Sequence, residues 1–512
     1  MILKLFSSRP EHPLGDAKAL KRILSALPGD NALKLVDEVH GWFESLRQAD
    51  GFAAGELFDI VRQLDEAAQP QLDRLTRDYL YSPRLSKNEE RRLWSVCFNY
   101  WGEVAGLYAL CSDGRDGRRK ARVPETSGDY RPLALARLVA ARAKQQKWIS
   151  YRYGVIGDDL WRGMARPYWA AVAAGCERAS LALYPGLEAS GSVEQQYLRA
   201  LVLASSSTDS LMPQEIELAD RLIGLLLPSF VFSGDCRSDS LYWIDVAEGG
   251  APVRLAQLPV ELSPDMRFIS PGDAPQALAE MIRLVEAGEL PPGLASGQGA
   301  GSEVPVRRVL AVLGHLASYW AVEPPQRSHP RHPMKTRMAV VHGFDDCFTL
   351  FSGNLARLGK ERSAESWVVE NVSLGGFRAR AETVADWLTP GVLLGMQPDG
   401  SESWGLGVVR RFSKEADDQA AVGIQSLSRQ ARSIELRPRT AGLSATGALP
   451  GICLGGCQAA GELRVVLPLS SFDARESLEF VDDGRRCLLL PVELEMSGGD
   501  FEIARYQSMV SE

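Results

Sequence analysis

The hydrophobic residues of this 512-residue chain change their spacing along the sequence, from a helical period to the alternation of strands. Residues 33–46 place their apolar side chains on one helical stripe made of Leu33, Val36, Val39, Trp42, Phe43 and Leu46. After residue 326, short apolar runs are separated by turn residues, a pattern that is typical of strands. Because one regular element cannot carry both periods, we predict a multidomain α+β chain, and the length is consistent with about three domains.

The first part of the chain, residues 1–228, is predicted to be a helical domain. Ser86 and Glu89 form the Ser-x-x-Glu pattern of a capping box, which marks the start of a helix. Pro213 suits the first turn of another helix. Besides 33–46, the predicted helical stretches are residues 86–110, 133–147, 193–205 and 213–227.

A small β excursion is predicted next, because short strand-like runs bounded by turn residues fill residues 229–272. The chain then returns to helix, passes through a Gly/Ser-rich linker at 291–303 and forms a last helix at 304–320. Residues 229–320 are therefore expected to be a mixed α/β segment that ends in a linker and a helix.

Two β-domains are predicted in the last part of the chain. Many short strands with turns between them favour a closed antiparallel barrel for residues 326–438, and residues 440–512 are expected to form a second small β-domain. The strands predicted for the barrel are MAVVHGF, CFTLFS, SWVVENVS, GFRARA, VLLGMQ, WGLGVVRRF and AVGIQSLS.

Composition excludes several classes of protein. The net charge of -8 argues against a dedicated nucleic-acid binder, which usually has a basic balance. The most apolar run, Ile223 to Phe232, is far shorter than the roughly 20 residues that a membrane span needs. The eight cysteines lack the spacing of a disulfide framework, and with no recognisable signal peptide we expect a cytoplasmic protein.

No metal site and no bound cofactor are expected. Cys453 and Cys457 form the one close cysteine pair, but no histidine stands near them to complete a zinc site. His329 and His332 are three residues apart, yet Pro330 prevents a helix there and no third ligand is evident.

A pair of arginines, Arg327 and Arg331, stands just before the first predicted strand of the barrel, in the motif Arg-Ser-His-Pro-Arg. Guanidinium groups offer fixed forks for phosphate oxygens and planar faces for stacking. Pro330 and Pro333 keep this stretch extended, so that both arginines can wrap around a ligand.

A second motif, Asn371-Val-Ser373-Leu-Gly375-Gly376, ends an apolar strand. It supplies an amide and a hydroxyl, and paired glycines let backbone N–H groups approach an anion. Together the two motifs suit a ligand with phosphates and flat bases. They contain no nucleophile with its base, which favours binding over catalysis.

In this order the two motifs resemble those of the PilZ domain, a bacterial receptor module for cyclic di-GMP. The residues that match its Arg-x-x-x-Arg and Asp/Asn-x-Ser-x-x-Gly patterns are Arg327, Arg331, Asn371, Ser373 and Gly376. The resemblance implies that the arginines clamp the dinucleotide while the turn holds guanine and phosphate. Gln326 leaves the number of bound ligand molecules open, and Arg410 and Arg411 are interpreted mainly as a charged strand end.

The resemblance implies a cyclic di-GMP effector that is not an enzyme. We expect ligand binding to change the arrangement of its domains and to signal to a protein partner, through the helical region, in the control of motility, pili or surface polysaccharide. Nothing in residues 1–325 selects among these outputs.

Two alternatives remain open. The barrel could be a scaffold that binds proteins and no ligand, or the helical region could be an enzyme. Against the second stands the absence of a recognisable catalytic motif beside its histidines, at positions 12, 40 and 315. Gly498-Gly499-Asp500-Phe501-Glu502 resembles a diguanylate cyclase signature, but its strand-like surroundings favour a hairpin turn.

Overall fold

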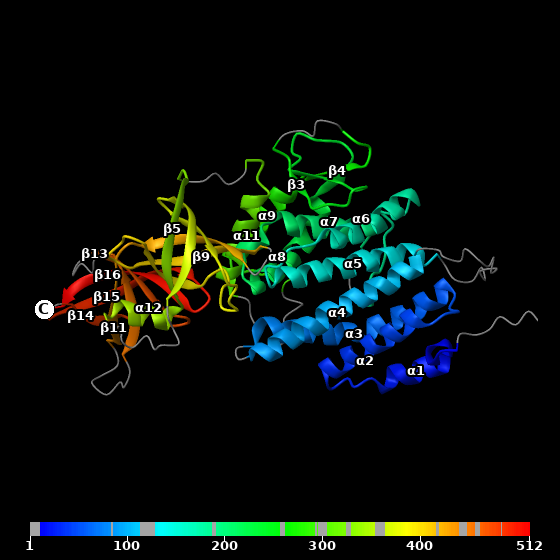
Figure 1. Cartoon of the computed structure of the whole chain (residues 1–512), viewed down its shortest axis with the longest axis horizontal. Coiled ribbons are helices and arrows are strands. Elements are labelled where there is room, and N and C mark those ends of the chain that lie inside the picture. Colours follow the sequence, from blue (N-terminus) through cyan, green and yellow to red (C-terminus); the bar gives the residue numbers. More distant parts are fainter. Residues whose placement is uncertain are drawn as a thin grey trace, which may run out of the picture. The chain divides into compact units, whose positions relative to one another are not determined.

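The computed structural model describes residues 11–82, 85–112, 129–186, 191–256, 262–291, 294, 305–323, 329–353, 364–415, 419–439, 448–455, 461–482 and 484–511. The described residues belong to two compact units: Met1–Thr208 with Pro213–Pro325, and Asp209–Met212 with Gln326–Glu512. The first unit is mainly helical and the second is built from strands (Figure 1). The predicted multidomain α+β organisation is confirmed.

Helices packed side by side form most of the first unit (Figure 1). They are α1 (Ala17–Ala26), α2 (Ala32–Gln48), α3 (Ala54–Tyr81), α4 (Lys87–Ser112), α5 (Arg131–Ser150), α6 (Asp158–Ala173), α7 (Val193–Ser205), α8 (Pro213–Leu226), α9 (Ala274–Glu286) and α11 (Val306–Tyr319). On α2 the predicted stripe is buried at Val36, Val39, Phe43 and Leu46. The capping box is also confirmed, since the backbone N–H of Ser86 donates to Glu89 Oε2 at 2.9 Å.

The predicted β excursion is a small antiparallel sheet in the order β1-β4-β2-β3. Its strands are β1 (Val231–Ser233), β2 (Tyr242–Asp245), β3 (Val253–Arg254) and β4 (Met266–Ser270). Phe232 packs against the rings of Tyr168 and Tyr197 on α6 and α7. Because the sheet buries its apolar face on these helices, residues 229–320 share one compact unit with them and do not form the separate segment expected from the sequence.

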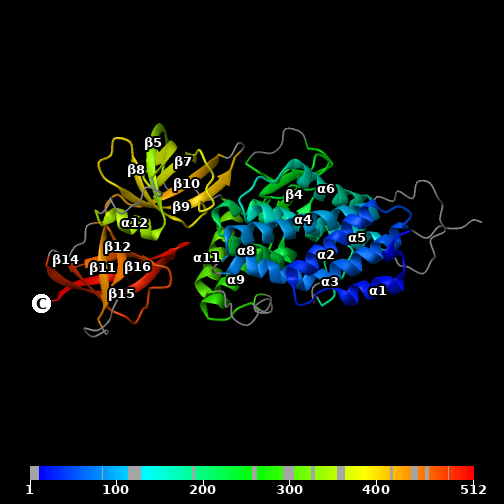
Figure 2. The same cartoon turned by 60° about the horizontal axis from the view of Figure 1, so that its bottom comes forward.

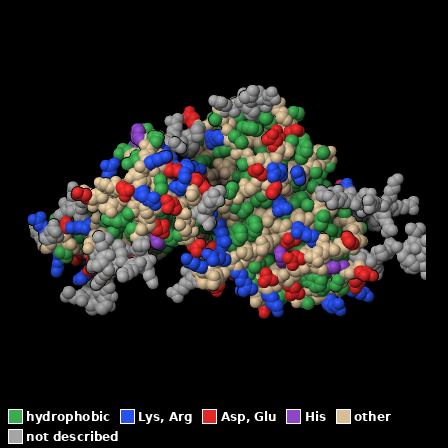
Figure 3. Space-filling model, in the orientation of Figure 1, with side chains coloured by type: hydrophobic (Ala, Val, Ile, Leu, Met, Phe, Trp, Pro, Cys, Tyr) green, Lys and Arg blue, Asp and Glu red, His purple; other side chains and the backbone are tan. Residues whose placement is uncertain are grey.

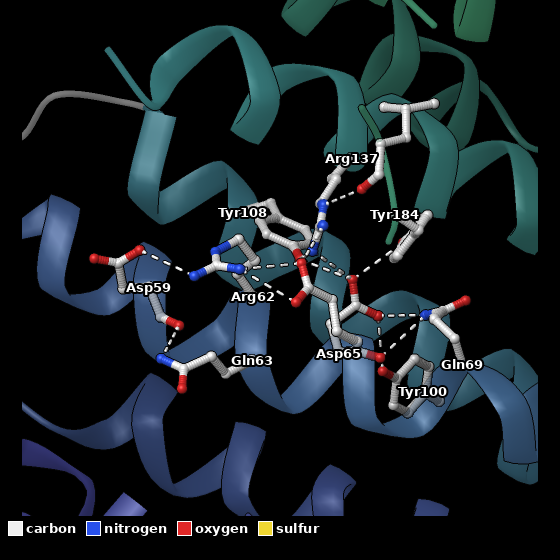
Figure 4. A network of polar contacts seen from close by, with 11 residues as sticks. Asp59, Arg62, Gln63, Asp65, Gln69, Tyr100, Tyr108, Arg137 and Tyr184 are labelled. Carbon is white, nitrogen blue, oxygen red and sulfur yellow. Dashed lines mark hydrogen bonds and ion pairs between the residues drawn. The ribbon is translucent and has the colours of Figure 1, made fainter. Parts of the chain in front are cut away.

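A buried carboxylate, Asp65 of α3, ties several helices together (Figure 4). Its oxygens accept hydrogen bonds, at 2.6–3.0 Å, from Gln69, Tyr100, Tyr108 and Tyr184. The guanidinium of Arg137, from α5, lies 3.6 Å from Asp65 Oδ2 and is itself buried. Burial raises the pKa of Asp65, and Arg137 and the hydrogen bonds oppose that rise. With its oxygens occupied by these donors, the cluster is suited to holding helices in place.

Replacing Asp65 by asparagine should destabilise the first unit. The amide removes the charge that faces Arg137 and sets an N–H₂ group against hydroxyl donors, which we expect to cost about 3 kcal/mol of unfolding free energy. Urea denaturation followed by circular dichroism measures this loss. The matched control is Asp59→Asn on the same helix, whose exposed pair with Arg62 should contribute less than about 1 kcal/mol. Equal stabilities of the two variants would contradict a structural role for the Asp65 cluster.

The second unit begins with a closed barrel of strands in the order β10-β7-β6-β5-β8-β9. These are β5 (His332–His342), β6 (Glu365–Ser373), β7 (Gly376–Ala381), β8 (Leu393–Pro398), β9 (Gly405–Lys414) and β10 (Ala420–Ser428). The predicted strand at CFTLFS is wrong, because this stretch lies in the helix α12 (Phe344–Phe351). Its buried residues Phe344, Cys347 and Leu350 recur every third position, which a single helical face explains.

A second closed barrel follows, in the order β11-β12-β13-β16-β15-β14. Its strands are β11 (Ala431–Pro438), β12 (Leu449–Leu454), β13 (Gly461–Pro468), β14 (Leu478–Asp482), β15 (Arg485–Ser497) and β16 (Phe501–Ser511). β11 pairs with β12 and β14, and its Ile434 and Leu436 enter the core of this barrel. The change of barrel therefore falls between Ser428 and Ala431, earlier than the boundary near 438–440 expected from the sequence.

One apolar cluster joins the two barrels, and α12 lies between them (Figure 2). The buried residues of this cluster are Phe344, Cys347, Leu393, Leu406, Val408, Ile452, Leu454, Val466, Phe501 and Ile503. The Gly498-Gly499-Asp500 segment is the turn between β15 and β16, as predicted, and it reaches the first barrel. Asp500 Oδ2 accepts the backbone N–H of Phe344 at 2.6 Å, and Gly499 donates its N–H to the carbonyl of Gly391 at 2.9 Å.

Among the described residues, no helix has the combination of length and apolar character that crossing a membrane requires. Figure 3 shows Lys and Arg side chains intermixed with Asp and Glu side chains over the visible face. The charges on this face are therefore mixed, in line with the modest net charge of -8.

Candidate ligand-binding site

The two motifs singled out in the sequence come together on the first barrel. His329 and Arg331 precede β5, while Ser373 ends β6 and Gly376 begins β7. Together with strands β9 and β10 they surround an open hollow of about 280 Å³. The residues that line it are His329, Arg331, Ser373, Gly375, Gly376, Phe377, Arg410, Arg411, Gly423, Ile424 and Gln425. Arg327 falls in 324–328, outside the described residues.

The turn between β6 and β7 is a two-residue connection in which Ser373 pairs with Gly376. The backbone N–H of Ser426, from β10, donates to the carbonyl oxygen of Gly375 at 3.0 Å. A methyl group on Gly375 would lie 3.5 Å from His329 Cδ2, which is ordinary contact, so the segment before β5 lies against this turn. The arginine motif and the turn motif are thus neighbours although about 40 residues separate them.

At Gly376 the backbone of β7 leaves no room for a side chain beside β10. A Cβ atom added there would lie 1.9 Å from the carbonyl oxygen of Ile424, a distance that no side chain can adopt. The φ angle of Gly376, 153°, also belongs to the region that favours glycine. Only glycine therefore allows these two strands to pair beside the hollow.

Asn371 lies on β6, paired with Arg378 of β7, and faces the same side of the strand as Ser373. It is not among the residues that line the hollow. Its Oδ1 atom is buried and has no hydrogen-bond partner in the described part of the chain. The structure thus brings Arg331, Ser373, Gly375 and Gly376 together and places Asn371 two residues before Ser373 on β6.

Three arginines, Arg331, Arg410 and Arg411, belong to the lining of the hollow, and Arg411 forms an ion pair with Asp209, which lies outside the lining. No Asp or Glu is found among the described residues that line it. Arginine forks make short, charge-assisted hydrogen bonds to phosphate oxygens, and their flat faces stack on bases. Phe377, which is partly exposed, adds an apolar side chain to the lining, so the arrangement suits an anion that also carries flat rings.

The site shows no pairing of a nucleophile with a general base in the described residues. The hydroxyl of Ser373 donates to the backbone carbonyl of Gly376 at 3.3 Å, and this is the hydrogen bond that the described residues show for it. The described residues also contain no group of three or more His, Cys, Asp or Glu placed to hold a metal ion.

Sequence reasoning understated Arg410 and Arg411, which it interpreted as a charged strand end. Both side chains line the hollow, although neighbours on a regular strand point to opposite faces. The signal that could have found them is their position between Val409 and Phe412, both buried, because two exposed residues between two buried ones mark an irregular strand. His329, considered above only as a metal ligand, also belongs to the lining.

Comparison with known proteins links the first unit to a receptor family. Residues 18–237 match the model of a family described as "Cyclic-di-GMP receptor FimW, N-terminal domain". The matched segment runs from α1 into the loop after β1, so it covers the helices and does not reach either barrel. A search among curated proteins finds no match to the chain.

Substitution of Gly376 by alanine should destabilise the first barrel, because the new methyl group collides with the carbonyl of Ile424. We expect the free energy of unfolding to fall by at least about 2 kcal/mol, and a larger fall should appear as poor expression. Gly375→Ala is the matched control, since its methyl group meets only ordinary contact and should change stability by less than about 1 kcal/mol. Thermal denaturation of both variants checks the difference. A Gly376→Ala protein as stable as Gly375→Ala would mean that β7 and β10 are not paired as described.

Proposed function

We propose that this protein is a receptor for cyclic di-GMP and that the hollow on the first barrel is its ligand site. The observation that carries the proposal is the convergence of Arg331 with Ser373, Gly375 and Gly376 around one hollow that is lined by arginines. Of these residues, Arg331, Ser373 and Gly376 match the Arg-x-x-x-Arg and Asp/Asn-x-Ser-x-x-Gly patterns of the PilZ domain. The family match of residues 18–237 supports the same ligand from a different part of the chain, because that family is described as a cyclic di-GMP receptor.

The ligand carries two phosphodiester groups and two guanine bases, and the site offers a partner for each kind of group. Arg331, together with Arg327 of the same motif, would bind phosphate oxygens and stack on guanine. The turn of Ser373, Gly375 and Gly376 would receive an edge of the ligand, since glycine allows close approach of the backbone. In this proposal the protein binds the dinucleotide without converting it.

We further propose that ligand binding acts on the helical unit through the chain that joins the two units. Arg254 of β3 donates to the carbonyl oxygens of Tyr319 and Ala321 at 3.1 and 2.9 Å, which holds the chain as it leaves α11. Residues 324–328, with Arg327 among them, join this held segment to His329. A ligand that draws in Arg327 and Arg331 would therefore act on the segment that Arg254 holds. The ligand can shift this segment from its ligand-free to its ligand-bound arrangement only as far as it binds the second arrangement more tightly than the first.

The output in this proposal is recognition of a protein partner by the helical unit, in the cytoplasm. Motility, pilus formation and surface polysaccharide are the settings implied by the PilZ resemblance, and the family match supports a receptor without selecting among them. Pull-down of partners with and without cyclic di-GMP tests this part of the proposal.

Wild-type protein should bind cyclic di-GMP in a calorimetric titration, and Arg331→Ala should weaken binding strongly. Loss of one charge-assisted contact costs about 1.5–3 kcal/mol, which corresponds to roughly 10- to 150-fold in the dissociation constant. The control is Arg337→Ala, an arginine of the same barrel that contacts Glu382 and Ser366 and does not belong to the lining of the hollow. Absence of binding to wild-type protein would favour the scaffold alternative, and equal losses in the two variants would mean that the site lies elsewhere.

Cyclic di-GMP should also change backbone amide exchange in residues 306–323 of the helical unit. In Arg254→Ala this response should disappear while the protein still binds cyclic di-GMP, because Arg254 does not belong to the lining of the hollow. Hydrogen exchange by mass spectrometry, with and without ligand, compares the two proteins. A response confined to the first barrel in wild-type protein would argue for a rigid receptor.

A further inference from the structure

We propose that Arg410 is an additional ligand-binding arginine and that it exchanges a contact with the second barrel for a phosphate oxygen when the ligand binds. This inference rests on the proposed function, because it names a further residue of the same site. It goes beyond the two motifs, which do not include Arg410, and it connects the site to a part of the chain for which the sequence suggested no role.

A β-bulge explains why Arg410 faces the hollow. In the pairing of β9 with β10, Arg411 lies opposite Gly423 while Val409 lies opposite Ile424, so Arg410 is the extra residue at this shift of register. Bulges turn side chains away from the regular alternation of a strand. As a result Arg410 and Arg411 both line the hollow, and Val409 and Phe412 on either side of them stay buried in the barrel.

Gln425 positions the guanidinium of Arg410. The Nε atom of Arg410 donates to Gln425 Oε1 at 2.6 Å, and both side chains belong to the lining of the hollow. A guanidinium group has several N–H donors in a fixed fork, so a bond at Nε sets the direction of the remaining donors. The arrangement keeps Arg410 aligned along the wall of the hollow.

The outer end of Arg410 contacts the second barrel. Its Nη2 atom lies 3.3 Å from Met496 Sδ on β15. A thioether sulfur is a weak hydrogen-bond acceptor, whereas a phosphate oxygen is a strong, charged one. An anionic ligand in the hollow therefore competes effectively with the Met496 sulfur for this guanidinium.

Met496 is placed so that this exchange affects the second barrel. It lies at an irregular point in the pairing of β15 with β16, where the register shifts between Leu494 and Met496. Its side chain packs against the apolar cluster that joins the two barrels. Release of Met496 should therefore alter the local packing and hydrogen exchange of β15 and β16, next to the turn whose Asp500 bonds to Phe344.

The experiment combines calorimetric titration with cyclic di-GMP and hydrogen exchange on the full chain, for wild type, Arg410→Lys, Met496→Leu and the control Arg337→Lys. Lysine keeps the charge but lacks the fork that bonds Gln425 and a phosphate together, so Arg410→Lys should weaken binding about tenfold. Met496→Leu removes the competing acceptor and keeps an apolar side chain, so it should bind as tightly as wild type or up to about threefold more tightly. Arg337→Lys should bind as wild type does.

Ligand should change amide exchange within 485–511 in wild-type protein, and this response should be absent or much smaller in Arg410→Lys at saturating ligand. Unchanged affinity of Arg410→Lys, in a protein whose circular dichroism matches wild type, overturns the binding role. Unchanged exchange of 485–511 on ligand binding to wild type overturns the link to the second barrel. Both results leave the proposed receptor function intact if wild type binds, whereas a wild-type protein that does not bind cyclic di-GMP removes the proposed function and this inference together.

Discussion

The candidate site depends on one close approach of two strands, β7 and β10 at Gly376 and Ile424. A side chain at Gly376 would collide with the carbonyl of Ile424, so glycine is what allows β7 to complete the barrel at this edge. Once the strands are paired there, the turn of β6 and β7 faces the irregular part of β9. Ser373 and Gly375 then lie near Arg410 and Arg411, although these residues come from separate parts of the chain. The charge of the hollow is therefore a consequence of barrel closure.

The second barrel is a structural partner of the first, because the two share an apolar cluster and α12. Burial of such a cluster is favourable in proportion to its apolar area, so the barrels are expected to behave as one unit. The Gly498-Gly499-Asp500 turn adds polar contacts to this apolar junction, through Phe344 and Gly391. Burial raises the pKa of Asp500, and the hydrogen bond from Phe344 opposes that rise. A segment that resembles a catalytic signature in sequence thus serves the packing of the two barrels.

Several features of the fold could be predicted from local sequence, and others could not. Capping at Ser86 and Glu89, the stripe on α2 and the positions of most strands follow from rules that act over a few residues. The sequence of α12 is predicted as a strand because a short apolar run is compatible with both the helical and the strand period. Its packing against both barrels favours the helix. Likewise, the residues of β11 do not indicate which barrel the strand belongs to. Its pairing with β12 and β14 places it in the second barrel.

The sequence by itself determined which residues are candidates for binding: it supplied two motifs in order, glycine at Gly376 and guanidinium groups at Arg327 and Arg331. Tertiary structure alone decided which of the described candidates share a hollow, that Asn371 is set beside it, and that Arg410 and Arg411 complete it. The physical reason is that motifs depend on residue type and spacing along the chain, whereas the charge of a site depends on strand pairing. A single bulge between β9 and β10 turns two neighbouring arginines to the same side, and only the pairing of these strands reveals it.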